Sequence, residues 1–257
     1  MYDFNWLGLW TLYKREVWRF LKVVHQTMLA PVVTTLLFLA VLALSVGSNS
    51  GRLVENIPYK QFIAPGLIMM AVVQNAFANT SSSLMIAKMQ GVIIDLLMPP
   101  FTGAEITFGL TMGGVTRGAL VGLVVTAFVY LFVPFHIAHI GLALFYLLAS
   151  SLMLAIIGLL TAIRSQSFDQ LSAITNYIIT PLSFLSGTFY SIRQLPEFWY
   201  KVCHLNPFFY MIDGFRYSFT DYADGSIPTG VAVICVTNIV LWYVAQKLIS
   251  KGYRLKT

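Results

Sequence analysis

The stretch TMLAPVVTTLLFLAVLALSV at residues 27–46 runs for twenty residues without a charged side chain. A helix needs about 20 mostly apolar residues to cross the hydrocarbon core of a bilayer, so this stretch predicts a transmembrane span. Pro31 stands near its start, where a missing amide donor is tolerated. The fold class depends on whether the rest of the chain repeats this pattern.

The composition of the whole chain is that of a membrane protein. Of its 257 residues, 58% are hydrophobic and only 10% are charged, and the mean hydropathy is +0.76. Soluble domains carry about 25% charged residues and could not hide so much apolar surface. We therefore predict one all-α, polytopic membrane domain over residues 1–257 with six transmembrane helices. The expected spans are residues 27–46, 61–83, 106–133, 140–163, 171–190 and 229–249.

Residues 5–24 precede the first span and have a different pattern. Aromatic and apolar side chains recur at alternating steps of three and four residues, which predicts a helix with one apolar face. Arg15, Arg19 and Lys22 take another face. Such an amphipathic helix suits the membrane interface, with its charges toward water. The alternative is an ordinary cytoplasmic helix that packs on the protein's own loops.

Polar side chains interrupt two of the predicted spans. Asn75, Asn79 and Ser83 fall four residues apart on one face of the second span. Asn176 lies in the fifth span ahead of Pro181, which predicts a kink. In lipid these side chains would lack partners, so they face other helices or a water-filled path. Hydrogen bonding between helices and the lining of a pathway both remain open.

The third span combines close helix packing with a charge. Gly114, Gly118 and Gly122 recur at every fourth residue, a row that lets helix backbones approach closely. Arg117 lies in the same run, about 15 Å along the helix from Thr107. A central arginine costs on the order of 3 kcal/mol, so it must face a partner, a cavity or the near interface. We favour a structural ion pair or an anchor that reaches the interface over direct contact with a substrate.

A short amphipathic helix is expected between the second and third spans. Residues 84–98 place apolar side chains at helical spacing, and Pro99 and Pro100 must end the helix. Thr102 and Glu105 then have the spacing of a capping box, which predicts the start of the third span. The short helix would therefore lie between two spans on one side of the membrane.

Residues 191–228 are aromatic and partly apolar, but Pro196, Pro207 and Gly214 interrupt them. Neither part is long enough to cross a bilayer, and segments of roughly 10 to 14 apolar residues are more often interfacial or re-entrant. We therefore expect re-entrant helices before the last span.

Basic residues set the expected orientation. Six spans that start from a cytoplasmic N-terminus place twice as many basic residues inside as outside, in agreement with the positive-inside rule. Both termini and residues 84–98 are then cytoplasmic, and residues 191–228 lie outside a plasma (inner) membrane. The inner set is Lys14, Arg15, Arg19, Lys22, Lys88, Arg164, Lys247, Lys251, Arg254 and Lys256. The outer set is Arg52, Lys60, Arg193, Lys201 and Arg216.

The sequence contains no set of residues for soluble enzyme chemistry. The patterns G-x-x-x-x-G-K-[ST], H-E-x-x-H and G-x-S-x-G are absent. His136 and His139 lack neighbouring carboxylates or thiols for a metal site, and Cys203 and Cys235 are expected to stay unpaired. The formal charge of +6 is spread along the flanks of apolar runs, which argues against nucleic-acid binding. We therefore expect no catalytic residue, metal or cofactor in this chain, and a role as part of a conduit.

Four stretches resemble the ABC-2 type transporter permeases, and the resemblance covers nearly the whole chain. They are QFIAPGLIMM at 61–70, GVIIDLLMPP at 91–100, GGVTRGALVG at 113–122 and HLNPFFYMIDGFRY at 204–217. The resemblance is to compact six-helix members that pair with a separate ATP-binding subunit. It implies that this partner binds ATP and Mg²⁺. It also implies that two permease copies, expected to form a homodimer, face each other above two ATPases.

The resemblance also implies roles for particular residues. Residues 84–98 would contact the ATPase, although Gly91 and Asp95 stand where the family often has the basic and acidic positions of R-x-x-x-E-x-L. The docking candidates are Lys88, Gly91, Asp95, Leu96 and Leu97. The candidates in the outer re-entrant segment are Asn206, Pro207, Asp213, Gly214 and Arg216. The intramembrane candidates for a pathway are Asn75, Asn79, Arg117 and Asn176.

The leading hypothesis is a permease that exports an amphipathic or lipid-linked substrate by alternating access, driven by closure of the partner ATPases. A secondary transporter or channel that works alone is the alternative. Inverted repeats with matching broken helices in the two halves would indicate it, but the interruption after the fifth span has no clear counterpart after the second. A scaffold subunit without transport is a third hypothesis. No side chain identifies the substrate.

Overall fold

The protein is described by a computed structural model that covers residues 5–47, 53–54 and 57–254. Within these residues, five helices are long and apolar enough to cross a membrane, and they coincide with five of the six predicted spans. Arg52 and Lys256, which entered the orientation argument, lie outside the described residues. The five are the η1–α2 run (His25–Leu29 and Ala30–Gly47), α3 (Tyr59–Met89), α5 (Gly103–Tyr130), α6 (Ile140–Arg164) and α11 (Ile227–Ser250).

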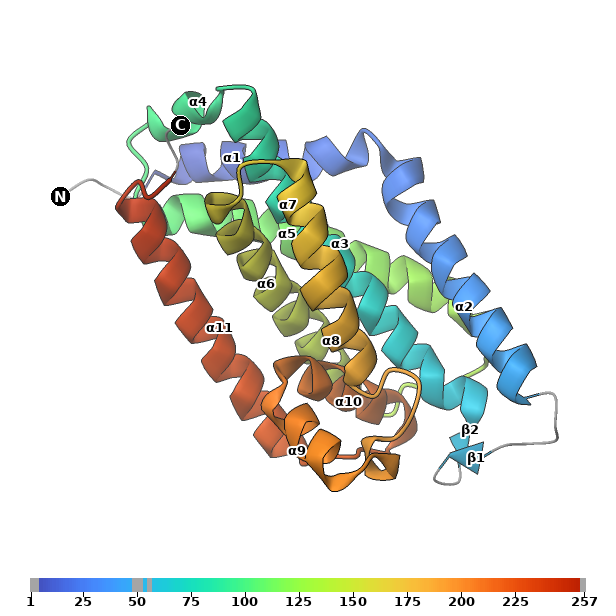
Figure 1. The fold of residues 1–257 in the computed structure, drawn as a ribbon. Helices are drawn as coiled ribbons and strands as arrows, with labels where there is room; N and C mark the ends of the chain where they lie inside the picture. The colour runs from blue at the N-terminus through green and yellow to red at the C-terminus, as the bar shows by residue number, and fades with distance from the viewer. Residues whose placement is uncertain (1–4, 48–52, 55–56, 255–257) are drawn as a thin grey trace.

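The helices form a bundle around α3, which packs against α2, α5, α6 and α10 (Pro207–Thr220). The start of α1 (Trp6–Leu21) and the end of α11 lie at one end of the bundle together with α4 (Ile93–Leu97), as Figure 1 shows. We call this the terminal end. The other end, the distal end, carries α9 (Glu197–Leu205), α10 and a short β-ribbon.

Close packing around α5 follows from its glycines. A Cβ on Gly114 would clash with Thr80 and with the backbone of α3, and a Cβ on Gly118 would meet the Ser151 side chain of α6. The predicted row of small residues is therefore confirmed as the contact of α5 with α3 and α6. The capping box is also confirmed, because the Thr102 side chain accepts from the amide of Glu105 and the Glu105 carboxylate accepts from the amide of Thr102.

Two helical runs widen into π-helices just before a proline. In η1 the π-helix ends two residues before Pro31, and η2 (Thr175–Ile179) ends two residues before Pro181. Proline lacks an amide hydrogen and its ring clashes with the carbonyl four residues back, so the preceding turn opens. The predicted fifth span is accordingly a continuous helical run of α7 (Phe168–Ile174), η2 and α8 (Thr180–Leu185), and it is not one of the five long apolar helices.

The amphipathic helix α1 packs one row of its side chains against the bundle. Leu9, Leu12, Glu16 and Phe20 are buried against the bundle, whereas Trp6 and Trp10 are exposed, with Trp6 at 71%. The row that contacts protein therefore includes a carboxylate. The exposed tryptophans are left to face the surroundings of the protein.

Residues 84–98 do not form one separate helix. Because α3 continues to Met89, its last turns take up the first part of this segment. Gly91 then adopts a left-handed conformation with φ of 72°, and α4 has only five residues before Pro99. The prediction of a short helix of several turns was wrong, because the periodic apolar residues up to Met89 belong to the span.

Residues 191–228, which we call the distal segment, are divided at the two prolines as predicted, but Gly214 does not interrupt the helix that contains it. Pro196 precedes α9 and Pro207 opens α10, which continues through Gly214. A Cβ at Gly214 would overlap the ring of Tyr146, so this glycine allows α10 to pack on α6. The other elements here are η3 (Ile192–Gln194) and the antiparallel strands β1 (Leu53–Val54) and β2 (Ile57–Pro58), an exception to the all-α expectation.

Candidate functional site

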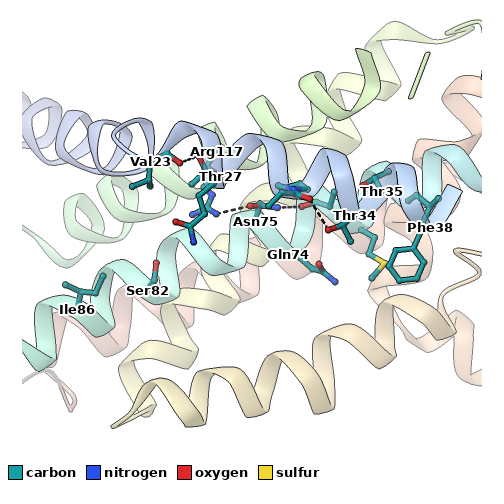
Figure 2. Close-up of a pocket in the computed structure, with 16 residues that line it drawn as sticks. Val23, Thr27, Thr34, Thr35, Phe38, Gln74, Asn75, Ser82, Ile86 and Arg117 are labelled. Carbon is teal, nitrogen blue, oxygen red and sulfur yellow. Dashed lines mark hydrogen bonds between the residues drawn. The ribbon is translucent and has the colours of Figure 1, made fainter. Parts of the chain in front are cut away.

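A cavity of about 630 Å³ lies beside α3, between that helix and the η1–α2 run, and Arg117 of α5 contributes to its wall (Figure 2). It follows α3 from Leu67 to Ile86, about 28 Å at 1.5 Å per residue. The cavity therefore connects the middle of the bundle with the terminal end. Its polar lining includes Gln26, Thr34, Gln74, Asn75, Ser82 and Arg117.

Arg117 lies in the middle of α5, about 20 Å from either end of the helix. Its Nη2 donates to Asn75 Oδ1 at 2.9 Å. No carboxylate of the described residues comes within 4.0 Å of its guanidinium, and its buried Nε has no hydrogen-bond partner among them. The predicted structural ion pair is therefore absent from the part of the chain that the structure describes. The charged group that acts on Arg117 is a second cation, Arg19.

Arg19 joins α1 to α3 next to the cavity. Its Nη2 donates to the backbone carbonyl of Asn79 at 2.6 Å and to Asn79 Oδ1 at 2.9 Å, and its Nη1 donates to Ser82 Oγ at 3.2 Å. Its Nε lies 3.4 Å from a carboxylate oxygen of Glu16, which is fully buried. The carboxylate of Glu16 therefore pairs with Arg19 and with Arg15, which lies 3.1 Å away, and no described carboxylate pairs with Arg117.

The structure brings three of the four predicted intramembrane residues together. Asn75 and Arg117 are hydrogen-bonded at the cavity wall, and Asn79 lies one helical turn further along α3, where it binds Arg19. Asn176 is separate, because it is exposed in η2 and does not line the cavity.

Sequence reasoning missed Glu16 as a partner in this cluster. The signal was present, because Glu16 interrupts the row Leu9, Leu12 and Phe20 at helical spacing. A buried carboxylate needs a charged or hydrogen-bonding partner, and here Arg15 and Arg19 of the same helix supply it. The opposing position is Gly113, which leaves room for the Glu16 stem.

Lys88, a predicted docking residue, is buried at the terminal end. Its Nζ donates to the carbonyls of Ala162, Ile163 and Ser165 at 3.1, 3.2 and 2.8 Å. These groups lie at the C-terminal end of α6, where backbone acceptors lack helical partners. Lys88 therefore joins the last turn of α3 to the end of α6.

The other docking candidates divide between the two sides of α4. Leu96 is buried and Leu97 is half-buried, whereas Gly91 and Asp95 are exposed. Ile94 and Met98 add exposed apolar surface, at 56% and 78%. The surface formed by Ile94, Asp95 and Met98, which we call the α4 surface, faces away from the bundle at its terminal end.

At the distal end, Arg216 is at the centre of a buried ionic cluster. Its Nη1 lies 3.9 Å from Asp213 Oδ1 and 4.0 Å from Asp224 Oδ2. Its Nε donates to the carbonyl of Phe62 at 3.1 Å, its Nη2 donates to the carbonyl of Gly187, and its Cζ lies 3.9 Å from the centre of the Phe62 ring. The guanidinium is thus neutralised and hydrogen-bonded on several sides.

The two carboxylates of this cluster are also hydrogen-bonded. Asp213 accepts from the amides of Asp224 and Gly225 at 2.8 and 2.9 Å. Asp224 accepts from Ser191 Oγ and from the hydroxyl of Tyr222, the latter at 2.6 Å. Burial raises the pKa of Tyr222 to about 12, and the hydrogen bond to Asp224 adds to the shift, so this hydroxyl remains a donor.

The remaining predicted residues of the distal segment join short elements. Asn206 accepts from the amide of Phe208 at the start of α10, and its Nδ2 donates to Ser186 Oγ at 2.8 Å. Pro207 follows as the first residue of α10. The distal cluster is therefore a set of structural contacts among α3, α8 and α10, while the cavity beside α3 is the candidate functional site.

Comparison of the sequence with known proteins identifies the family of the chain. The family profile described as ABC-2 type transporter matches residues 8–220. The chain is 37% identical to the inner membrane transport permease YadH of Escherichia coli (strain K12) over 257 residues, 100% of both chains. It is 23% identical to nodulation protein J of Sinorhizobium fredii over 252 residues, 96% of this chain and 93% of that one. Nodulation protein J of Rhizobium leguminosarum bv. viciae is 23% identical over 249 residues, 96% of this chain and 94% of that one.

The chain belongs to the ABC-2 type transporter family. The match extends over most of the bundle, and the relative with the highest identity of those above is named a membrane transport permease. With its apolar helices, the protein is a multi-pass membrane permease of an ABC transporter.

Proposed function

We propose that this permease is the membrane-spanning subunit of an exporter whose separate ATP-binding subunit binds ATP and Mg²⁺. Its substrate is amphipathic or lipid-linked and moves by alternating access, so its affinity must differ between the two states of the conduit. The observation that carries the proposal is the cavity beside α3, with polar and apolar walls, which leads from the middle of the bundle to the terminal end.

Six crossings fit the positions of the two chain ends better than five. The start of α1 and the end of α11 lie at the same end of the bundle, which requires an even number of crossings (Figure 1). The helical run 168–185 is about 27 Å long at 1.5 Å per residue, close to the thickness of the hydrocarbon core. We assign the sixth crossing to it. The basic residues then put the terminal end in the cytoplasm and α9 and α10, as the re-entrant segment, on the outer side.

A second copy of the chain completes the proposed conduit. Asn176 and its neighbour Tyr177 are exposed in η2, and the exposed fraction of Tyr177 is 81%. A polar side chain on a crossing segment lacks a hydrogen-bond partner if it faces lipid. Contact with a second permease at the helical run 168–185 would provide a hydrogen-bond partner for Asn176. The bilayer surrounds the remaining apolar faces.

The α4 surface is the proposed contact with the ATP-binding subunit. It lies at the terminal end and exposes apolar side chains beside the carboxylate of Asp95. Movement of the partner against α4 would act directly on α3, because the two helices are joined by the short turn at Gly91. The α3 helix in turn forms one wall of the cavity.

The test is co-purification of the tagged permease from a host that also makes its natural ATP-binding subunit. The double variant Ile94→Asp with Met98→Asp should lose the ATPase and remain a folded membrane protein, since both side chains are exposed. Leu205→Asp is the matched control, because Leu205 is 86% exposed at the distal end. If the double variant co-purifies with as much ATP-binding subunit as the wild type does, the α4 contact is refuted. A wild-type chain that never brings down an ATPase would favour an autonomous transporter or channel.

A further inference from the structure

We propose that the cavity beside α3 binds an amphiphile with a phosphate or carboxylate head group, and that this oxyanion binds the guanidinium of Arg117. The inference rests on the proposed export function and deepens it, because it assigns a charge to the substrate. It follows from the charges around the cavity, from the depth of Arg117 and from the two kinds of wall.

The charge balance leaves one cation without a counter-ion. Glu16 lies 3.1 Å from Arg15 and 3.4 Å from Arg19, so these two guanidinium groups share its carboxylate. The described carboxylates are all more than 4.0 Å from Arg117, so this third cation has no counter-ion among them. A guanidinium has five N–H donors, and Asn75 is the acceptor that the described residues supply to Arg117. The buried Nε is still unpaired. A phosphate or carboxylate accepts two parallel hydrogen bonds from such a fork, which a water molecule or an amide does not.

Arg117 lies well inside the span and not at either of its ends. It lies about 20 Å from both ends of α5, further than an arginine side chain reaches. A charge at this depth is expensive unless it is paired or faces a water-filled cavity. Arg117 lines the 630 Å³ cavity, so a ligand can reach it there.

The second wall of the cavity distinguishes an amphiphile from a free anion. Phe38, Leu67 and Met70 line the same space as Arg117 and Asn75 (Figure 2). A free phosphate would use only the polar wall and leave these apolar side chains facing water. The volume of about 630 Å³ lies within the usual range for ligand pockets and accommodates a head group together with part of an acyl chain.

The experiment measures binding of short-chain phosphatidic acid to the purified full-length permease in a neutral detergent. We expect saturable binding that Arg117→Gln weakens about tenfold or more, because a charge-assisted hydrogen bond is lost. Arg117→Lys keeps the charge without the fork and should give an intermediate affinity. Arg164→Gln, an exposed arginine at the end of α6, is the control and should bind as the wild type does. Equal binding by wild type and Arg117→Gln, or equal binding of the matching diacylglycerol, would overturn the proposal.

A second measurement leaves Arg117 unchanged, so it does not depend on the folding of that variant. Gln74→Cys places a thiol in the cavity wall, on a Cys235→Ser background because Cys235 is exposed. Phosphatidic acid should slow alkylation of this thiol several-fold and leave Leu205→Cys at the distal end unaffected. Equal alkylation rates with and without the lipid would refute binding in the cavity. If millimolar inorganic phosphate displaces the lipid, the ligand is a free oxyanion and the proposal of an amphiphile is refuted.

These binding assays use the permease alone, so their outcome is separate from that of the export proposal. Phosphatidic acid binding at Arg117 in a chain that recruits no ATPase would keep the oxyanion site and refute the exporter. An ATPase complex whose permease binds phosphatidic acid and diacylglycerol equally would keep the exporter and refute the oxyanion site.

Discussion

Arg216 at the distal end and Arg117 beside the cavity both lie among apolar helices, but their surroundings differ. Arg216 has two carboxylates within 4.0 Å, two backbone carbonyl acceptors and the face of Phe62. Arg117 has the amide oxygen of Asn75 and the like charge of Arg19. The first environment neutralises a cation, whereas the second leaves a cation available.

The comparison separates a charge that supports the fold from a charge that is free to bind a ligand. A buried ion pair is expensive to break, because removal of one partner leaves the other buried without compensation. A buried charge that has no partner contributes little to stability, and its removal can even be favourable. Substitution of Arg216 should therefore lower the stability more than substitution of Arg117 does, and substitution of Arg117 should lower ligand binding more.

The largest expected effect is that of Arg216→Gln, which leaves Asp213 and Asp224 buried without their cation. We expect a loss of about 3–5 kcal/mol in the free energy of unfolding, measured by thermal unfolding in mild detergent. Arg193→Gln is the matched control, because Arg193 contacts the same Asp224 at 3.5 Å from a half-exposed position. Its cost should stay below about 1 kcal/mol. Equal losses in the two variants would mean that burial does not decide the value of these ion pairs.

Lys88→Gln should have the next largest effect. The change removes the ammonium group from three carbonyls at the end of α6, and we expect a loss of about 1.5–3 kcal/mol. Lys60→Gln, at an exposed lysine near the other end of α3, should leave the melting temperature almost unchanged. A tolerated Lys88→Gln that instead loses the ATPase would show that Lys88 acts in docking and not in packing.

Gly214→Ala tests whether the distal cluster depends on the position of α10. The new Cβ overlaps the ring of Tyr146, and overpacking of this kind costs about 1–3 kcal/mol. Adding Tyr146→Leu should recover part of the loss. Gly141→Ala on α6 meets no atom within 4 Å and should be neutral or slightly stabilising, by the same melting measurement. No difference between the two alanine variants would argue against the tight contact of α10 with α6.

Arg117→Gln should have the smallest effect on stability, below about 1 kcal/mol in either direction, because no carboxylate is left unpaired. The same preparation should show the reduced phosphatidic acid binding described above. If this variant instead loses as much stability as Arg216→Gln, Arg117 has a structural partner and the contrast between the two arginines fails.

The depth of Arg117 could be read from the spacing of apolar residues, but its neighbours could not. Asn75 and Arg19 come from two other helices, α3 and α1, so their approach to Arg117 depends on how those helices pack. The expected ion pair was a reasonable solution to a buried charge, but no carboxylate in the described part of the chain forms it. The nearest acid, Glu16, lies beside Arg19.

The face that α1 buries was also beyond the sequence pattern. The row that contains Trp6 and Trp10 and the row that contains Leu9, Leu12 and Phe20 both carry large apolar side chains. Lipid is as apolar as the side chains of a helix, so hydrophobicity does not distinguish a face toward lipid from a face toward protein. Local signals were more reliable, because the capping box of Thr102 and Glu105 and the π-helical widening before Pro181 depend only on neighbouring residues.

The sequence by itself determined that this is a polytopic helical membrane protein, since long uncharged segments partition into a bilayer whatever their neighbours are. It also determined where helices start and widen, since caps and prolines act within one turn. Only the tertiary structure decided which cations are neutralised. Asn75 reaches Arg117 from another helix, and the carbonyls of Phe62 and Gly187 reach Arg216 from distant segments, so packing decides these contacts. The carboxylates beside Arg216 are close in sequence, because Asp213 lies one turn back on α10 and Asp224 follows shortly after the helix.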